Sequence, residues 1–196
     1  DNLLNSDEGK SIALPYFKER GFTEKTIEAF DLGYSMRSGK SLTELALSNG
    51  YKLEILKQAG LVREKDDRKY DFFRERVMFP IHNLTGRVIA FGGRILRSNE
   101  KAPKYVNTPE SEVYVKSKIL YGAFQAKKAV REKENCFLVE GYTDVISLYQ
   151  SGIENVMASS GTSLTADQVR LVRRFTPKVT LLYDGDPAGI KAAIRG

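Results

Sequence analysis

Three carboxylates in the last third of the chain have the spacing that metal-dependent phosphoryl chemistry needs. Glu140 follows the apolar run 136–139, and Asp184 and Asp186 follow the apolar run 179–183. A glycine comes directly after each of the first two acids, and glycine lets a phosphate approach the backbone closely. Mg²⁺ prefers oxygen ligands and needs only one or two carboxylates beside substrate phosphates. The pattern therefore predicts a divalent metal site for phosphoryl chemistry.

The elements that carry these acids alternate in type from residue 135 onward, and a β-α-β-α-β-α order predicts a parallel sheet. The carboxyl ends of parallel strands share one edge of a sheet, where ligands bind in open α/β folds. We therefore expect the three acids to converge. The expected strands are 136–140, 155–158 and 178–183, and residues 159–162 are expected to form a turn. The expected helices begin at 143, near 165 and at 187, and Thr165 with Gln168 forms a capping box for the second of them.

Asp186 and Asp144, each taken singly, could instead have a purely structural role. Asp186 precedes Pro187 and is well placed to cap a helix amino terminus. Asp144 lies in the first turn of its helix, where a negative charge complements the helix dipole. The combination of Glu-Gly after one strand with Asp-Gly-Asp-Pro-Ala-Gly after another is much rarer by chance than either cap alone.

The charge of the chain is concentrated in its middle third. The 196 residues carry a net charge of +6, and residues 61–131 alone carry +8, while the segments on either side each carry −1. Such an excess predicts a surface that binds a polyanion, and the alternative is a solvated charged face. No apolar stretch approaches the roughly 18–20 residues of a membrane span. The lone Cys136 excludes an intramolecular disulfide and a cysteine-based zinc site, and an intracellular location is expected.

Upstream of the acids we expect a domain of residues 1–134 and a second domain of residues 135–196. Residues 1–60 read as a helical packing region, with a capping box at 41–44. Residues 61–134 read as a basic mixed α/β region. Its expected elements are an edge strand at 76–81 that contains Pro80, a turn at 83–86, a strand at 87–91, a loop at 97–117 and a helix at 119–133.

Two sets of motifs resemble known families. The segments 140–144 (Glu-Gly-Tyr-Thr-Asp) and 184–189 (Asp-Gly-Asp-Pro-Ala-Gly) are similar to the Toprim domain of bacterial primases and topoisomerases. The segments 74–81, 86–94 and 103–111 resemble the RNA-polymerase core of the bacterial replicative primase family, DnaG. The likeness spans essentially the whole chain and continues at Lys116, Tyr121 and Gly122.

The resemblance implies a mixed α/β amino-terminal subdomain with a basic groove, followed by a truncated Toprim subdomain with a Rossmann-like parallel sheet. It also implies template-directed synthesis of short RNA primers on single-stranded DNA, by nucleotidyl transfer from ribonucleoside triphosphates during replication. Glu140, Asp184 and Asp186 would hold Mg²⁺ or Mn²⁺, with Asp144 as an auxiliary ligand.

The basic region would contact template and nucleotide. For each basic residue taken singly, a solvated or structural charge is as good an interpretation as a contact. Tyr105 has an alternative as a core residue, and Arg76 as a partner of Glu75 or Asp71. The expected contacts are Arg74, Arg76, Arg94, Lys104, Tyr105, Asn107 and Lys116.

Some features of the family are expected to be missing. Phe72 stands where many members carry a basic residue. The family's zinc-binding module and the module that contacts the replicative helicase are not in this sequence. The family also has a further acidic cluster beyond the last helix, so we expect an incomplete Toprim sheet, poor metal binding and an inactive fragment. The resemblance places the protein in the bacterial cytoplasm at the replication fork.

Two other functions stay open at this point. One is another Toprim protein, of the topoisomerase or nuclease type, although the tyrosine-bearing domain of a topoisomerase is not apparent. The other is a non-catalytic module that binds single-stranded nucleic acid and uses its acids only as helix caps. Loss of synthesis with retained binding in an Asp184 variant separates an enzyme from such a module.

Overall fold

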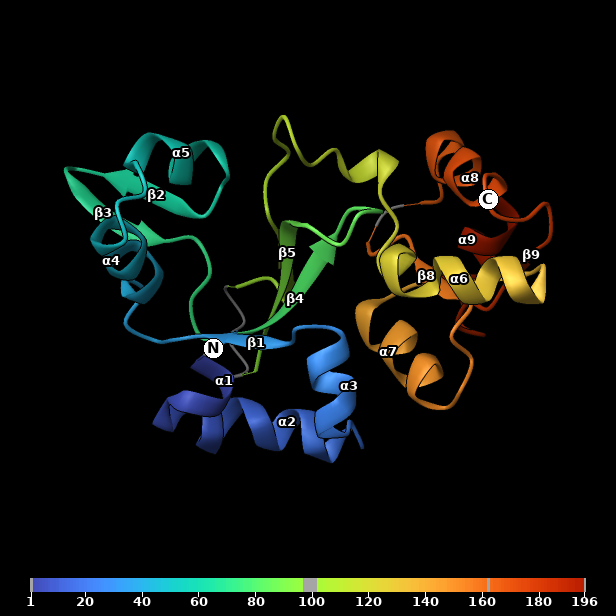
Figure 1. Ribbon diagram of the computed structural model, residues 1–196, viewed down its shortest axis with the longest axis horizontal. Coiled ribbons are helices and arrows are strands. Elements are labelled where there is room, and N and C mark those ends of the chain that lie inside the picture. The colour runs from blue at the N-terminus through green and yellow to red at the C-terminus, as the bar shows by residue number, and fades with distance from the viewer. Residues whose placement is uncertain (1, 97–101, 162, 196) are drawn as a thin grey trace. The chain divides into compact units, whose positions relative to one another are not determined.

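The computed structural model describes residues 2–96, 102–161 and 163–195, and the chain divides into two compact units (Figure 1). The first unit comprises Asp1–Pro80 and Ala90–Tyr114, and the second comprises Ile81–Ile89 and Val115–Gly196. Residues 97–101 of the expected loop 97–117 lie outside the described residues. Among the described residues, no helix has the length and apolar character that crossing a membrane requires.

The first unit contains the helical region predicted for residues 1–60, together with two antiparallel sheets. Its helices are α1 (Asn2–Asn5), a π-helical segment (Gly9–Ala13), α2 (Leu14–Glu19), α3 (Glu24–Ala29), α4 (Ser41–Ser48) and α5 (Leu53–Gln58). Its strands are β1 (Gly33–Ser35), β2 (Val62–Lys65), β3 (Arg68–Asp71), β4 (Arg76–His82), β5 (Val88–Ile95) and β6 (Tyr105–Asn107), of which β4 and β5 run on into the second unit.

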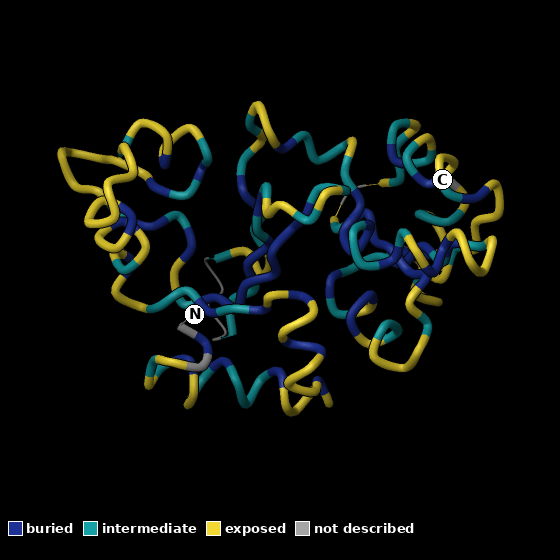
Figure 2. The backbone as a smooth tube through the Cα atoms, in the orientation of Figure 1, coloured by how far each residue is buried: buried dark blue, intermediate teal, exposed yellow. Residues whose placement is uncertain are grey.

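Strand β4 is central in its sheet, so its prediction as an edge strand was wrong. The strand order is β1-β4-β5-β6, and β4 is buried along its whole length (Figure 2). A central strand forms hydrogen bonds with a neighbour on each side, and proline has no N–H to donate to either of them. Pro80 is tolerated because β1 is short: its register with β4 ends at the pair Gly33 and Met78, and Pro80 lies beyond it.

Helix α4 begins where predicted, but its capping box does not form. No side chain at its N-cap accepts a hydrogen bond. The buried carboxylate of Asp71, at the end of β3, instead accepts the backbone N–H groups of Leu42 at 3.0 Å and Thr43 at 2.9 Å. It also accepts the Thr43 hydroxyl at 2.6 Å. A charged acceptor from a neighbouring strand thus satisfies the first N–H groups of the helix.

The second unit is built on the predicted parallel sheet, in the order β8-β7-β9. The helices α6 to α9 gather around these strands in the yellow-to-red part of the chain (Figure 1). The bounds are a 3₁₀ turn at Lys116–Lys118, α6 (Ala123–Lys133), β7 (Cys136–Val139), α7 (Tyr142–Gln150), β8 (Val156–Ala158), α8 (Ala166–Arg173), β9 (Val179–Leu181) and α9 (Pro187–Arg195).

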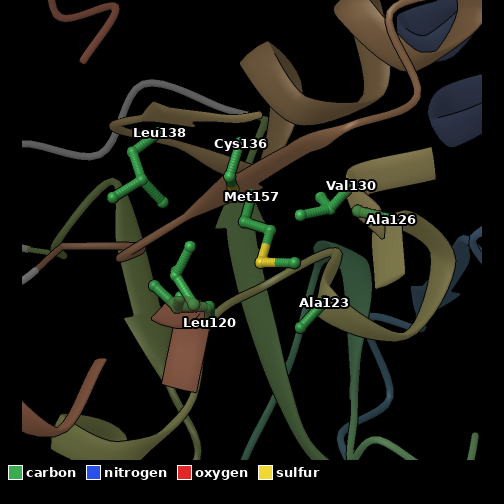
Figure 3. Close-up of a cluster of buried hydrophobic side chains, with 8 residues drawn as sticks. Leu120, Ala123, Ala126, Val130, Cys136, Leu138 and Met157 are labelled. Carbon is green, nitrogen blue, oxygen red and sulfur yellow. The ribbon is translucent and has the colours of Figure 1, made fainter. Parts of the chain in front are cut away.

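A cluster of buried side chains joins α6, β7, β8 and α8 in this unit. Figure 3 shows its members converging, with Met157 of β8 near Leu120 and Val130. The turn 83–86 between β4 and β5 also packs here. His82, the last residue of β4, is buried, with its ring 5.8 Å from that of Phe124.

The packing of this hairpin moves the division between the units away from residue 134. Lys127 of α6 donates a hydrogen bond to the carbonyl oxygen of Leu84 at 2.8 Å. Gly86 also lies against Phe124, at a positive φ of 86° where a side chain would collide with that ring. The hairpin and α6 therefore belong to the compact unit of the parallel sheet rather than to an amino-terminal domain that ends at 134.

Cys136 should be unreactive in the folded protein. It is fully buried in the cluster, and burial raises the pKa of its thiol from 9.0 to about 12. We expect iodoacetamide at pH 8 to label it only after unfolding in urea, as mass spectrometry would show. The folded protein keeps this proton where the unfolded chain has lost it. The part of the free energy of unfolding that depends on this protonated thiol is therefore fully present below about pH 9 and is lost as pH rises toward 12. Rapid labelling without urea would contradict this burial.

Candidate active site

Glu140 and Asp184 lie next to each other at the carboxyl edge of the parallel sheet. Glu140 directly follows β7, and Asp184 follows β9, its parallel neighbour, whose register pairs Leu138 with Leu181. The Oε1 atom of Glu140 accepts a hydrogen bond from the backbone N–H of Asp184 at 3.2 Å. The parallel-strand rule thus correctly predicts that these two residues meet, whereas Asp186 does not join them in a cluster of three acids among the described residues.

Gly189 explains part of the spacing in the acidic motif. A Cβ atom at this position would collide with the backbone carbonyl of Asp184 and lie 2.9 Å from Oε1 of Glu140. Residue 189 is therefore restricted to glycine by the close approach of α9 to both strand ends. The restriction keeps the amino-terminal turn of α9 against the two acids.

Asp186 and Asp144 both serve as helix caps, which was predicted for Asp186, whereas Asp144 was expected only to complement the dipole of its helix. Oδ1 of Asp186 accepts the backbone N–H of Gly189 at 2.7 Å. Oδ2 of Asp144 accepts the backbone N–H of Gly141 at 2.9 Å. Both side chains are exposed. A carboxylate has two oxygens and about four acceptor positions, so one capping bond leaves capacity for a metal ion.

A pocket of about 270 Å³ lies beside Glu140. The loop after β8 forms part of its wall, and the backbone N–H of Ser160 donates to the carbonyl oxygen of Glu140 at 3.1 Å. Burial, and then the negative charge of Glu140, raise the pKa of Tyr183, which therefore stays neutral at physiological pH. The described lining consists of Glu140, Ser159, Gly161, Ser163, Leu164, Tyr183 and Ala192.

Lys116 lies at the border of this pocket, in the second unit. Its Nζ atom is 3.4 Å from the carbonyl oxygen of Gly161, one of the lining residues. Lys116, a predicted nucleotide contact, therefore lies at the same pocket as Glu140, because Lys116 and Glu140 both bond to the loop after β8. An ammonium group here is well placed for the phosphates of a nucleotide.

Arg94 and Tyr105 form a cation–aromatic group on neighbouring strands of the first unit. They are register partners in β5 and β6, and the guanidinium donates to the Tyr105 hydroxyl at 3.1 Å. The guanidinium carbon also lies 5.1 Å from the ring centroid of Tyr16. Tyr105 is 37% exposed, so its alternative as a core residue is wrong. An exposed ring beside a guanidinium group is suited to base stacking.

Arg76 has a different role from the predicted template contact. Its side chain is buried, and burial lowers the pKa of the guanidinium. It donates hydrogen bonds to the carbonyl oxygens of Gly93 at 3.1 Å, Pro103 at 3.1 Å and Lys104 at 3.3 Å. The alternative partners are engaged elsewhere, because Glu75 pairs with Arg37 and Asp71 caps α4. Arg76 therefore holds the segment that leads into β6.

The other predicted contacts of the first unit are at least partly accessible. Lys104 is exposed beside Tyr105, and Asn107 is half-buried at the end of β6. Arg74 is exposed, with its guanidinium carbon 5.4 Å from the ring centroid of Tyr70. Phe72 packs edge-on against Phe73. The guanidinium carbon of Arg63 lies 5.0 Å from the ring centroid of Phe72, so a cation lies beside the residue that replaces the family's basic side chain.

Comparison with known proteins decides the family. The family model of the DNA primase catalytic core, N-terminal domain, matches residues 1–127. The chain belongs to the DNA primase family. A Toprim-like family model matches residues 137–196, so the predicted boundary at 134 separates these two matches although it does not separate the two compact units.

Relatives and solved structures agree with this primase assignment. A DNA primase of Halalkalibacterium halodurans is 42% identical over 98% of this chain, which covers 32% of that relative. The RNA polymerase domain of Mycobacterium tuberculosis primase DnaG superposes with a TM-score of 0.93 at 33% identity, covering 99% of this chain and 65% of that one. A DnaG primase catalytic domain bound to ssDNA gives a TM-score of 0.86 at 39% identity, covering 100% and 60%. The chain spans about a third of the length of the curated relatives that it matches.

Primase and Toprim membership implies the use of a divalent metal ion. Within the described ranges, no three His, Cys, Asp or Glu side chains gather closely enough to hold an ion by themselves. The donor chemistry nevertheless fits Mg²⁺, because Glu140 lies against the backbone of Asp184, both residues offer carboxylate oxygens, and this ion needs only one or two carboxylates beside phosphates.

Sequence reasoning missed the contribution of the loop after β8. Residues 159–162 were predicted only as a turn, and Thr162 lies outside the described residues. The position of this Ser-Ser-Gly sequence at the carboxyl end of a parallel strand would have marked it as a possible wall of the pocket beside Glu140. Tyr183 was likewise treated only as the last residue of a strand.

Proposed function

We propose that this chain is part of the catalytic core of a primase, which synthesises short RNA primers on single-stranded DNA from ribonucleoside triphosphates. The observation that carries the proposal is the adjacency of Glu140 and Asp184 beside a pocket bordered by Lys116. An acid that lines the pocket, a second acid directly beside it and a lysine bonded to another lining residue suit a metal-bound triphosphate. Membership of the primase family supports ribonucleoside triphosphates as the substrate class.

In the proposed reaction, the 3′-hydroxyl of one nucleotide attacks the α-phosphorus of the next, and pyrophosphate leaves. Glu140, Asp184 and Asp186 would hold Mg²⁺ or Mn²⁺, with Asp144 in an auxiliary position. Such an ion offsets negative charge on the triphosphate and favours deprotonation of the attacking hydroxyl. Lys116 would bind the triphosphate, and the loop after β8 would bound the nucleotide.

The basic residues of the first unit would hold the template. Arg74, Arg94 and Lys104 would contact phosphates, with Tyr105 stacking on a base and Asn107 donating to a phosphate or sugar. A solved relative is described as bound to ssDNA, which supports template binding of this kind. The expected setting is a bacterial replication fork, with a helicase contact made by a module outside this sequence.

The direct test is synthesis itself. Incubating a chain with its carboxyl end restored with a single-stranded DNA template, ribonucleoside triphosphates and Mg²⁺ should yield short RNA products that depend on both template and metal. Products that form without template, or no products at all with intact template binding, would contradict the proposal.

A second candidate is a module that binds single-stranded nucleic acid without catalysis. The capping bonds of Asp186 and Asp144 favour it, because caps alone account for both side chains. Such a module would bind template equally well with and without Mg²⁺ and would make no primers, so the same assay separates the two functions.

Replacing Lys104 by alanine should weaken template binding at every sequence and lower the salt dependence. One lost phosphate contact reduces the slope of log K against log salt by about one. Filter binding of an oligonucleotide at several salt concentrations measures both quantities. Lys128→Ala is a matched control, since Lys128 is exposed on α6 and pairs with Glu132. An unchanged slope for Lys104→Ala would exclude the phosphate contact.

A further inference from the structure

Gln168, in the first turn of α8, is a fully buried polar side chain whose bonds reach outside its own helix. Its amide nitrogen donates to the carbonyl oxygens of Ile119 at 2.9 Å and Lys116 at 3.3 Å. Its amide oxygen accepts the backbone N–H of Thr165 at 3.1 Å and completes the capping box predicted from sequence. A buried amide engaged in this way is costly to disturb, because its partners would lose their bonds out of reach of water.

The bonds of Gln168 are part of a wider attachment of the turn that carries Lys116. The hydroxyl of Thr165 donates to the carbonyl oxygen of Ser117 at 2.5 Å. Further along the same segment, Tyr121 and Ala158 exchange backbone hydrogen bonds of 2.8 and 3.0 Å. The segment 116–121 is therefore held by α8 and by the end of β8.

Packing reinforces this attachment. Leu120 is fully buried between the two sets of bonds and belongs with Val172 of α8 to one core cluster, in which Figure 3 shows Leu120 close to Met157. The backbone that carries Lys116 is thus fixed by both hydrogen bonds and apolar contacts.

The side chain of Lys116 leads from this fixed turn to the pocket. Its Nζ atom lies 3.4 Å from the carbonyl oxygen of Gly161, and the neighbouring Ser160 is bonded to the backbone of Glu140 at 3.1 Å. Lys116 and the backbone of Glu140 therefore both bond to the loop 159–161, which forms part of the wall of the pocket that Glu140 lines.

We propose that Gln168 is a positioning residue that fixes Lys116 for contact with the triphosphate of the nucleotide. This inference rests on the proposed function, in which Lys116 binds that triphosphate. Lysine has a long flexible side chain, so a turn with a fixed backbone reduces the freedom lost on binding. Gln168 acts through Lys116 and does not touch the nucleotide.

The test compares two variants of Gln168 by titration of ATP with Mg²⁺. Gln168→Met keeps the length of the side chain and removes the whole amide. Gln168→Glu keeps the oxygen that accepts from Thr165 but removes both N–H donors, so it separates the helix cap from the contacts to Lys116 and Ile119. We expect both to weaken ATP binding about tenfold, within the range of couplings between residues in contact. Gln168→Met carries the comparison if Gln168→Glu, whose buried carboxylate would face two carbonyl oxygens, does not fold.

The deciding measurement repeats both variants in a Lys116→Ala background. Positioning predicts no further loss there, because the group being positioned is gone. An equal loss in both backgrounds would mean general damage to the fold and would overturn the inference, as would normal ATP affinity in both Gln168 variants. Ile146→Val is the control, since this buried residue of α7 tests mild destabilisation of the same unit.

The same data separate this inference from the proposed function. If Lys116→Ala alone leaves ATP affinity unchanged, the nucleotide contact of Lys116 is wrong, and the role of Gln168 falls with it. If Lys116→Ala weakens binding while both Gln168 variants bind normally, only the positioning role is wrong.

Discussion

In a chain with its carboxyl end restored, replacing Asp184 by asparagine, or Glu140 by glutamine, should abolish primer synthesis while template binding persists. Both changes keep the size of the side chain, and the amide introduced by Glu140→Gln would still present an oxygen to the backbone N–H of Asp184. What is lost is a negative charge at the metal position. A loss of about 4 kcal/mol of transition-state stabilisation corresponds to about a 10³-fold lower rate.

The measurement is the yield of short RNA on a defined template, with template affinity determined in parallel. Asp167→Asn is the matched control, because Asp167 is an acid of the same unit that pairs with Arg170 on the surface of α8. It should retain normal synthesis. Normal primer yield from either Asp184→Asn or Glu140→Gln would remove the metal role from these acids.

The adjacency of these acids could be predicted because it depends on local patterns. Apolar runs that alternate with helices define a parallel sheet, and the strand ends of such a sheet meet at one edge. The register of Leu138 with Leu181 then brings Glu140 beside Asp184. The capping boxes and N-caps of this half, at Thr165 and Asp186, likewise depend on residues only three apart.

The features that could not be predicted depend on residues distant in sequence. The capping box at Ser41 gives way to Asp71, which lies 28 to 29 residues from the N–H groups it accepts. Pro80 lies in a central strand because β1 is too short to reach it. Gln168 was recognised as a cap, but its bonds to a turn about 50 residues away were not visible in the pattern.

Arg76 is the clearest case in which a functional prediction gave way to a structural role, and its replacement should have the largest effect on stability. Arg76→Met removes a buried guanidinium that donates to three backbone carbonyls between Gly93 and Lys104. The lost hydrogen bonds from a charged donor, and the carbonyl groups left without a donor, together lower the free energy of unfolding by about 3 kcal/mol. Arg76→Lys should recover only part of it, because an ammonium group lacks the planar fork that reaches several acceptors.

The same variant should also weaken template binding, because the segment that Arg76 holds carries Lys104, Tyr105 and Asn107 into β6. Urea unfolding and oligonucleotide binding measure the two effects. Arg37→Met is the control, since Arg37 is 68% exposed and pairs with Glu75 at 3.6 Å, a surface pair worth about 0.5 kcal/mol or less. Unchanged stability combined with a salt slope lowered by about one would instead restore Arg76 as a phosphate contact. The two measurements together therefore decide whether this arginine binds the template or holds the residues that do.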